Sequence, residues 1–131
     1  MNVRESDNVS LWFKRAEDDL SVARALSDKK AFFPHIVAYH CHESAEKALK
    51  AFLIARQTPY PKTHDLVVLL NLSKNILPEF NILAPPVSNL NPLYIEEKYP
   101  FEPVEDYCDK QLRSFVTSAK QIFDFVKAKI C

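Results

Sequence analysis

Residues 36–65 read IVAYHCHESAEKALKAFLIARQTPYPKTHD, and this stretch decides how the rest of the chain is interpreted. Apolar and small residues recur every three or four positions as far as Arg56, which predicts one long α-helix. Pro59 and Pro61 prevent that helix from continuing, because proline lacks a backbone N–H and crowds the preceding turn. Thr63 is the expected N-cap of a further helix, with Asp65 in its first turn.

The long helix is predicted to have two different faces. Glu43 and Lys47, like Glu46 and Lys50, are four residues apart with the acid first, the favourable order for ion pairs on a solvated face. The other face is expected to pack closely, since most of its residues are small: Val37, Cys41, Ser44, Ala45, Ala48, Phe52 and Ala55.

Periodicity predicts three further helices around this one. The first runs from Ser6 or Asp7 to about Ser27, after a flexible arm of residues 1–7; the third runs to about Asn75; and the last runs from about Val104 to the end. Residues 78–103 contain six of the nine prolines, so we expect an irregular segment with one short helix at about 88–97. The sequence therefore predicts a single all-α domain over residues 1–131, an antiparallel bundle of four to five helices.

The amino-acid composition argues against several classes of protein function. The 131 residues include 17 basic and 17 acidic side chains, which argues against a broadly basic nucleic-acid-binding surface. The chain has no glycine, which excludes glycine-rich phosphate loops. No apolar run is long enough for a membrane span, and the N-terminus is too polar for a signal peptide. Cys41 and Cys108 fall on apolar faces, so we expect buried free thiols in a cytoplasmic protein.

Four motifs resemble the HEPN family, whose name abbreviates higher eukaryotes and prokaryotes nucleotide-binding. They are AEDDL at 16–20, SAEKALKA at 44–51, YPKTHDL at 60–66 and KYP at 98–100. The resemblance implies a small helical bundle similar to nucleotidyltransferase substrate-binding subunits, usually dimeric and often encoded beside a minimal nucleotidyltransferase in toxin–antitoxin-like modules.

The chain departs from the family pattern in three places. Glu43-Ser44 stands where the family often has Gln-Ala, and Lys98 stands where the family often has arginine, so the charge is kept without the bidentate fork. Some HEPN branches are metal-independent RNases with an R-x4–6-H motif. Here seven residues separate Arg56 from His64, so that motif is absent. Its absence argues against an enzyme but leaves the question of activity open.

Candidate ligand-binding residues are those whose charge or ring suits a nucleotide phosphate or base: Lys47, Lys50, Lys62, His64, Lys98 and Tyr99. His64 is also the candidate general acid–base. The structural alternatives are a salt-bridged helix face for Lys47 and Lys50, and a packed cap residue for His64.

The histidines do not predict a metal site. His40 and His42 point about 200° apart on a helix, and His42 with Glu46 supplies only two ligands. We therefore expect neither a metal nor another cofactor.

The expected function is an interaction and nucleotide-binding module. Its expected partners are a second copy of the chain, a nucleotidyltransferase-family protein and a nucleotide or RNA, with no membrane. Two alternatives remain open: an RNase that uses His64 with Lys98 or Lys62, and a scaffold without a small ligand.

Overall fold

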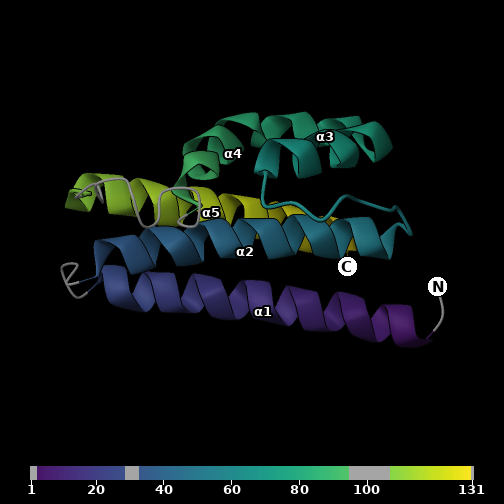
Figure 1. The fold of residues 1–131 in the computed structure, drawn as a ribbon, viewed down its shortest axis with the longest axis horizontal. Coiled ribbons are helices and arrows are strands. Elements are labelled where there is room, and N and C mark those ends of the chain that lie inside the picture. The colour runs from purple at the N-terminus through teal and green to yellow at the C-terminus, as the bar shows by residue number, and fades with distance from the viewer. Residues whose placement is uncertain (1–2, 29–32, 95–106, 131) are drawn as a thin grey trace.

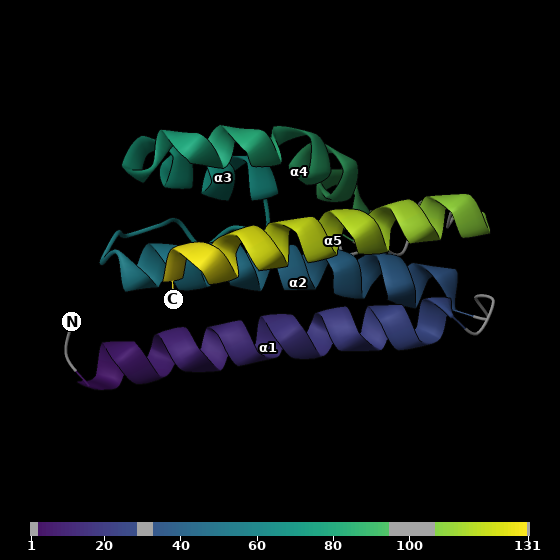
Figure 2. The same ribbon diagram turned by 180° about the vertical axis from the view of Figure 1, so that it is seen from behind.

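The computed structural model describes residues 3–28, 33–94 and 107–130, the first five of these by their backbone alone. Its long helices are α1 (Val3–Ser27), α2 (Pro34–Ala55) and α5 (Asp109–Ile130). Figures 1 and 2 show them side by side, with α1 running opposite to α2 and α5. The shorter elements α3 (Leu66–Ile76), η1 (Pro78–Leu83), α4 (Ala84–Leu90) and η2 (Asn91–Leu93) cover the side away from α1. The described part of the chain has no strand, so the all-α helical bundle is confirmed.

The central helix is α2, which contacts α1, α3, α4 and α5. It is buried around most of its circumference, from Val37 to Leu53. Ala45 and Ala48 are fully buried, and the Ser44 hydroxyl donates to the carbonyl of Ala16 on α1 at 2.8 Å. The predicted close packing of the small-residue face is thus confirmed within the bundle. The prediction that the opposite face of α2 is solvated was wrong, because Glu43, Glu46 and Lys50 are buried.

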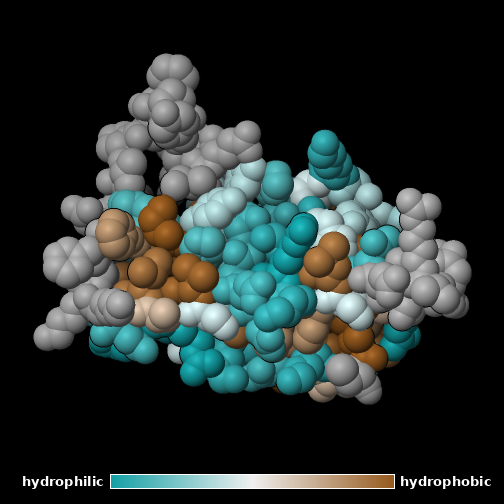
Figure 3. All heavy atoms as spheres, turned by 90° about the horizontal axis from the view of Figure 1, so that it is seen from below, coloured by the Kyte–Doolittle hydropathy of each residue, from teal (hydrophilic) through white to brown (hydrophobic). Residues whose placement is uncertain are grey.

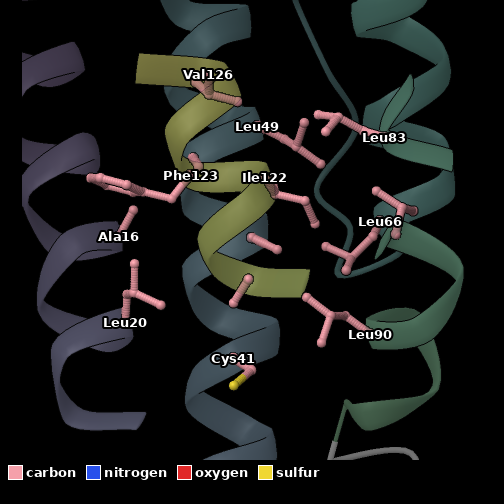
Figure 4. Close-up of a cluster of buried hydrophobic side chains, with 14 of the residues drawn as sticks. Ala16, Leu20, Cys41, Leu49, Leu66, Leu83, Leu90, Ile122, Phe123 and Val126 are labelled. Atoms are coloured by element: carbon pink, nitrogen blue, oxygen red, sulfur yellow. The ribbon is translucent and has the colours of Figure 1, made fainter. Parts of the chain in front are cut away.

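The apolar core joins all the layers, as Figure 4 shows. Leu20 comes from α1, Leu49 from α2 and Ile122 from α5, while Leu66 and Leu90 come from the covering layer. Burying an aliphatic side chain of this size stabilises a fold by about 1.5–3 kcal/mol. Within the described residues, no helix combines the length and apolar composition needed to cross a bilayer.

The proline-rich stretch is more regular than predicted. Residues 78–93 form η1, α4 and η2 in succession, and each of these elements has proline in its first two positions. Proline is well suited there because the first N–H groups of a helix have no partner within it. The remainder of the segment, residues 95–106, lies outside the described residues.

The helix starts also differ from the predictions. The backbone of α1 is already helical at Val3, so the arm does not extend to residue 7. Asp65, not Thr63, is the N-cap of α3: its carboxylate accepts the Val67 N–H at 2.9 Å, while the Thr63 hydroxyl accepts the Asp65 N–H. α5 begins at Asp109, later than expected.

The end of α2 shows how the chain manages without glycine. Gln57 has a positive φ of 52°. The Thr58 N–H bonds the Leu53 carbonyl and the Gln57 N–H bonds the Ile54 carbonyl, the Schellman pattern that usually has glycine at the left-handed position. A non-glycine residue adopts this backbone conformation at a cost of roughly 1–2 kcal/mol.

The two described cysteines lie in opposite environments. Cys41 is buried, as expected, and burial raises the pKa of its thiol to about 12. Cys108 is exposed, contrary to prediction, because it immediately precedes α5 and does not share its apolar face.

We expect Cys108, but not Cys41, to react with a thiol reagent in the folded protein, because only an accessible thiolate is a good nucleophile. The measurement is Ellman titration of a Cys131→Ser variant: one fast thiol in buffer and two in guanidinium chloride. Loss of the fast phase in Cys108→Ser is the control, and two fast thiols in the folded protein would contradict the assignment.

Candidate functional site

Ionisable side chains gather along α2, between α1 and the loop before α3. We call them the polar cluster: Asp19, His40, His42, Glu43, Glu46, Lys47, Lys50 and His64. Most come from α2 itself, so a single rigid helix sets much of the geometry.

On the α1 side of the polar cluster, Asp19 pairs with Lys47 and His40. Its carboxylate lies 2.6 Å from the Lys47 ammonium and 2.7 Å from His40 Nδ1, and Lys47 is also 3.8 Å from Glu43. Asp19 is only 8% exposed because Ala16 and Ala23, one turn to either side, pack against the core. Lys47 is therefore already paired with carboxylates and does not offer a free charge to a phosphate.

On the α3 side of the polar cluster, Glu46 pairs with Lys50 and His64. It accepts a hydrogen bond from Lys50 at 2.9 Å, and its other oxygen lies 2.8 Å from His64 Nδ1. The Lys50 ammonium also lies 5.7 Å from the ring centres of Trp12 and Tyr60, within cation–π range. Lys50, like Lys47, thus has its charge compensated inside the protein.

His64 is where the polar cluster reaches solvent. Its side chain is 47% exposed, and its ring stacks on Tyr94 with centroids 4.1 Å apart. A buried carboxylate at Nδ1 and an aromatic ring at its face fix the orientation of the imidazole. Such a histidine is suited to donate or accept a proton at its other nitrogen.

His42 lies at the centre of the cluster and is fully buried. Its Nδ1 is 3.7 Å from Glu43 Oε1 and 3.9 Å from Glu46 Oε1. Neither of its ring nitrogens, nor Glu43 Oε1, has a hydrogen-bond partner among the described residues. Burial acts to raise the pKa of the Glu43 carboxyl, but nearby His42, Lys47 and His64 outweigh it and hold that pKa below its ordinary value.

The structure brings together some of the predicted site residues. Lys47, Lys50 and His64 belong to the polar cluster, and Lys62 is exposed on the loop that leads to His64. Lys98 and Tyr99 lie outside the described residues. The first turn of α3 offers little to an anion, since Asn91 accepts the Leu66 N–H and Asp65 accepts the next one.

Sequence reasoning did not include five residues of this region among the candidates: Asp19, His40, His42, Glu43 and Tyr94. The sequence did contain a signal that Asp19 faces the interior. Asp19 lies three residues after Ala16 and four before Ala23, so the three residues share one apolar stripe of the helix. His42 and Glu46 were considered alone, but a potential ligand atom of Glu43 also lies within 4.8 Å of theirs. No comparable signal marked Tyr94, which reaches His64 through tertiary packing.

Comparison with known proteins assigns the fold to a family. The sequence matches the HEPN domain family over residues 9–129. The chain belongs to the HEPN family.

Three similar proteins were found, one by sequence and two by structure. The chain is 28% identical to the protein named "Putative toxin MJ1304" from Methanocaldococcus jannaschii, over 89% of this chain and 84% of that protein. The fold is similar to the crystal structure of ST0689, an archaeal HEPN homologue, with a TM-score of 0.73, 23% identity and coverage of 94% and 98%. It is also similar to TT1696 from Thermus thermophilus, with a TM-score of 0.72, 23% identity and coverage of 92% and 97%.

Proposed function

We propose that this HEPN chain is the nucleotide-binding, toxin-like component of a two-gene system whose other component is a minimal nucleotidyltransferase. The observation that carries the proposal is the polar cluster, buried along α2 and open to solvent at His64. The relative named "Putative toxin MJ1304" supports the toxin-like part of the proposal.

The cluster holds more charge than packing alone explains. Asp19, Glu46 and Lys50 are each less than 10% exposed. Removing an ion from water costs several kcal/mol, and apolar residues of similar volume often stabilise a core as well or better. Ionisable groups gathered at such a cost mark a candidate functional site.

The binding face of this proposal is the His64–Tyr94 ring pair together with Lys62, which is exposed two residues before His64 on the same loop. Stacked rings offer a platform for a nucleobase, and stacking contributes about 1–3 kcal/mol per base. Lys62 supplies a charge for phosphate, since Lys47 and Lys50 are compensated by carboxylates. Lys98 and Tyr99, in the KYP motif, are the further ligand residues of this proposal.

We expect ATP to bind the wild-type chain, and His64→Ala to weaken that binding by about tenfold, the equivalent of 1.4 kcal/mol of lost stacking and hydrogen bonding. Calorimetric titration and ¹H–¹⁵N chemical shifts measure it. His35→Ala is the matched control, because His35 packs against Tyr107, outside the polar cluster, and its truncation is expected to leave affinity unchanged. Absence of heat and of shift changes in a folded sample would favour the scaffold without a small ligand.

The protein partners belong to the same proposal. Figure 3 shows apolar side chains in two patches on the α1 face, and Val22, Phe33 and Ile36 are exposed where α1 ends and α2 begins. Such surface suits a second copy of the chain. Light scattering at micromolar concentration tests the homodimer, with a monomer as the contrary result. Co-purification with a nucleotidyltransferase encoded in the neighbouring reading frame tests the other partner.

One observation favours a second function, that of a metal-independent RNase. The buried Glu46 carboxylate at His64 Nδ1 leaves the other ring nitrogen available for the 2′-OH of RNA. Lys62 or Lys98 would then stabilise the phosphate charge. This function requires that the purified protein cleave RNA in EDTA and that His64→Ala abolish cleavage; intact RNA under these conditions would exclude it.

A further inference from the structure

We propose that His42, Glu43 and Glu46 form a binding site for a divalent first-row transition metal ion such as Zn²⁺. All three residues are on α2, all three are buried, and each offers one ligand atom within 4.8 Å of the others. This inference does not depend on the proposed nucleotide-binding function.

The spacing of the ligand atoms suits an ion at their centre. His42 Nδ1 lies 3.7 Å from Glu43 Oε1 and 3.9 Å from Glu46 Oε1. An ion placed between the three atoms is about 2–2.5 Å from each, close to the bond lengths of protein-bound zinc. Small side-chain rotations close the remaining difference, and α2 needs no rearrangement.

The unpartnered state of His42 is the independent observation that points to a ligand. A neutral imidazole has one donor and one acceptor nitrogen, and leaving a buried polar group unsatisfied costs about 1–3 kcal/mol. Neither nitrogen of His42 has a hydrogen-bond partner among the described residues, and the nearest oxygen of Glu43 also has none. A metal ion bonded to His42 Nδ1 and Glu43 Oε1 satisfies two of these three atoms at once.

The ligand types indicate which metal ions fit. Imidazole nitrogen favours zinc, cobalt and related ions, whereas magnesium prefers an all-oxygen octahedral site with several waters. The balance of charges in the polar cluster also suits a bound cation. The cluster has three carboxylates, Asp19, Glu43 and Glu46, and two lysines, Lys47 and Lys50. Three protein ligands leave at least one coordination position for water or another small ligand, as in catalytic rather than structural zinc sites.

The experiment uses the untagged 131-residue chain with Cys108 and Cys131 replaced by serine, so that accessible thiols do not contribute. After treatment with a chelator, the protein is titrated with Zn²⁺ by calorimetry and with Co²⁺ by visible absorption, which reports coordination number. We expect one ion per chain, no comparable heat with Mg²⁺, and a large change in the ring ¹⁵N shift of His42. No nucleotide is present, so a negative result here leaves the nucleotide proposal unaffected.

Variants identify the ligands. We expect Glu43→Gln and His42→Asn each to weaken Zn²⁺ binding at least tenfold. His35→Asn, on α2 but outside the polar cluster, is expected to leave it unchanged. Circular dichroism establishes that each variant is folded. If His42→Asn does not fold, Glu43→Gln decides, because the Glu43 side chain retains 11% exposure at the cluster edge. Absence of Zn²⁺ binding by the parent chain, or undiminished binding by Glu43→Gln, would overturn the proposal.

Discussion

Replacing Glu46 with alanine is expected to lower the free energy of unfolding by about 3–5 kcal/mol, the range observed when one partner of a buried ion pair is removed. Lys50 would lose its carboxylate partner at 2.9 Å while its side chain stays only 9% exposed, and His64 would lose the group that fixes its ring. Urea denaturation monitored by circular dichroism, in EDTA, measures the loss.

The chain contains a matched control in Lys120 and Asp124. These residues have the same i,i+4 spacing and a similar distance of 2.8 Å, but both side chains are about half exposed. Asp124→Ala is expected to cost less than about 0.5 kcal/mol, because solvent screens exposed pairs. Equal losses in Glu46→Ala and Asp124→Ala would show that the burial of the Glu46 pair has no energetic consequence.

Truncating Phe52 to alanine is the second large expected effect, about 3–5 kcal/mol of stability. Its ring is fully buried on α2, and its centroid lies 4.4 Å from that of Phe80 in η1. Phe80 in turn contacts Phe125 of α5 at 4.9 Å. The substitution leaves a cavity where three elements meet, so lost contacts and lost burial add together.

Phe33→Ala is the comparison for Phe52→Ala. Phe33 is 57% exposed in the single chain, so the same truncation removes little buried surface when both variants are measured at concentrations where the chain is monomeric. We expect its urea midpoint to shift by less than a quarter of the Phe52→Ala shift. Comparable shifts in the two variants would mean that the Phe52–Phe80–Phe125 contacts do not connect the covering layer to α5.

The long helices were predictable because each contains a strong local pattern. Apolar spacing marked α1, α2 and α5, and the Thr58–Pro61 turn correctly separated α2 from α3. The same reasoning failed at residues 78–93, where the high proline content, including Pro78, Pro85 and Pro92, was interpreted as a sign of irregular structure. Proline prevents a helix from continuing through it, but it is compatible with the first turn of a new helix, and sequence alone did not distinguish the two cases.

The polar cluster was only partly predictable, for a different reason. The Glu46–Lys50 pair follows from spacing within α2 and is present. The burial of this pair does not follow from the spacing, because it depends on α1 and Tyr60 packing over the pair. The partners Asp19 and His64 lie 28 residues before Lys47 and 18 residues after Glu46 respectively. Spacing within one helix carries no information about such pairs.

Asn91 has a consequence for the order in which the site assembles during synthesis. Its side chain accepts the Leu66 N–H and donates to Asp65, so it fixes the start of α3 from 25 residues further along the chain. Tyr94, which stacks on His64, follows three residues later. A ribosome-bound chain can therefore form α1 and α2 early, but the orientation of His64 is complete only after residue 94 has emerged from the ribosome.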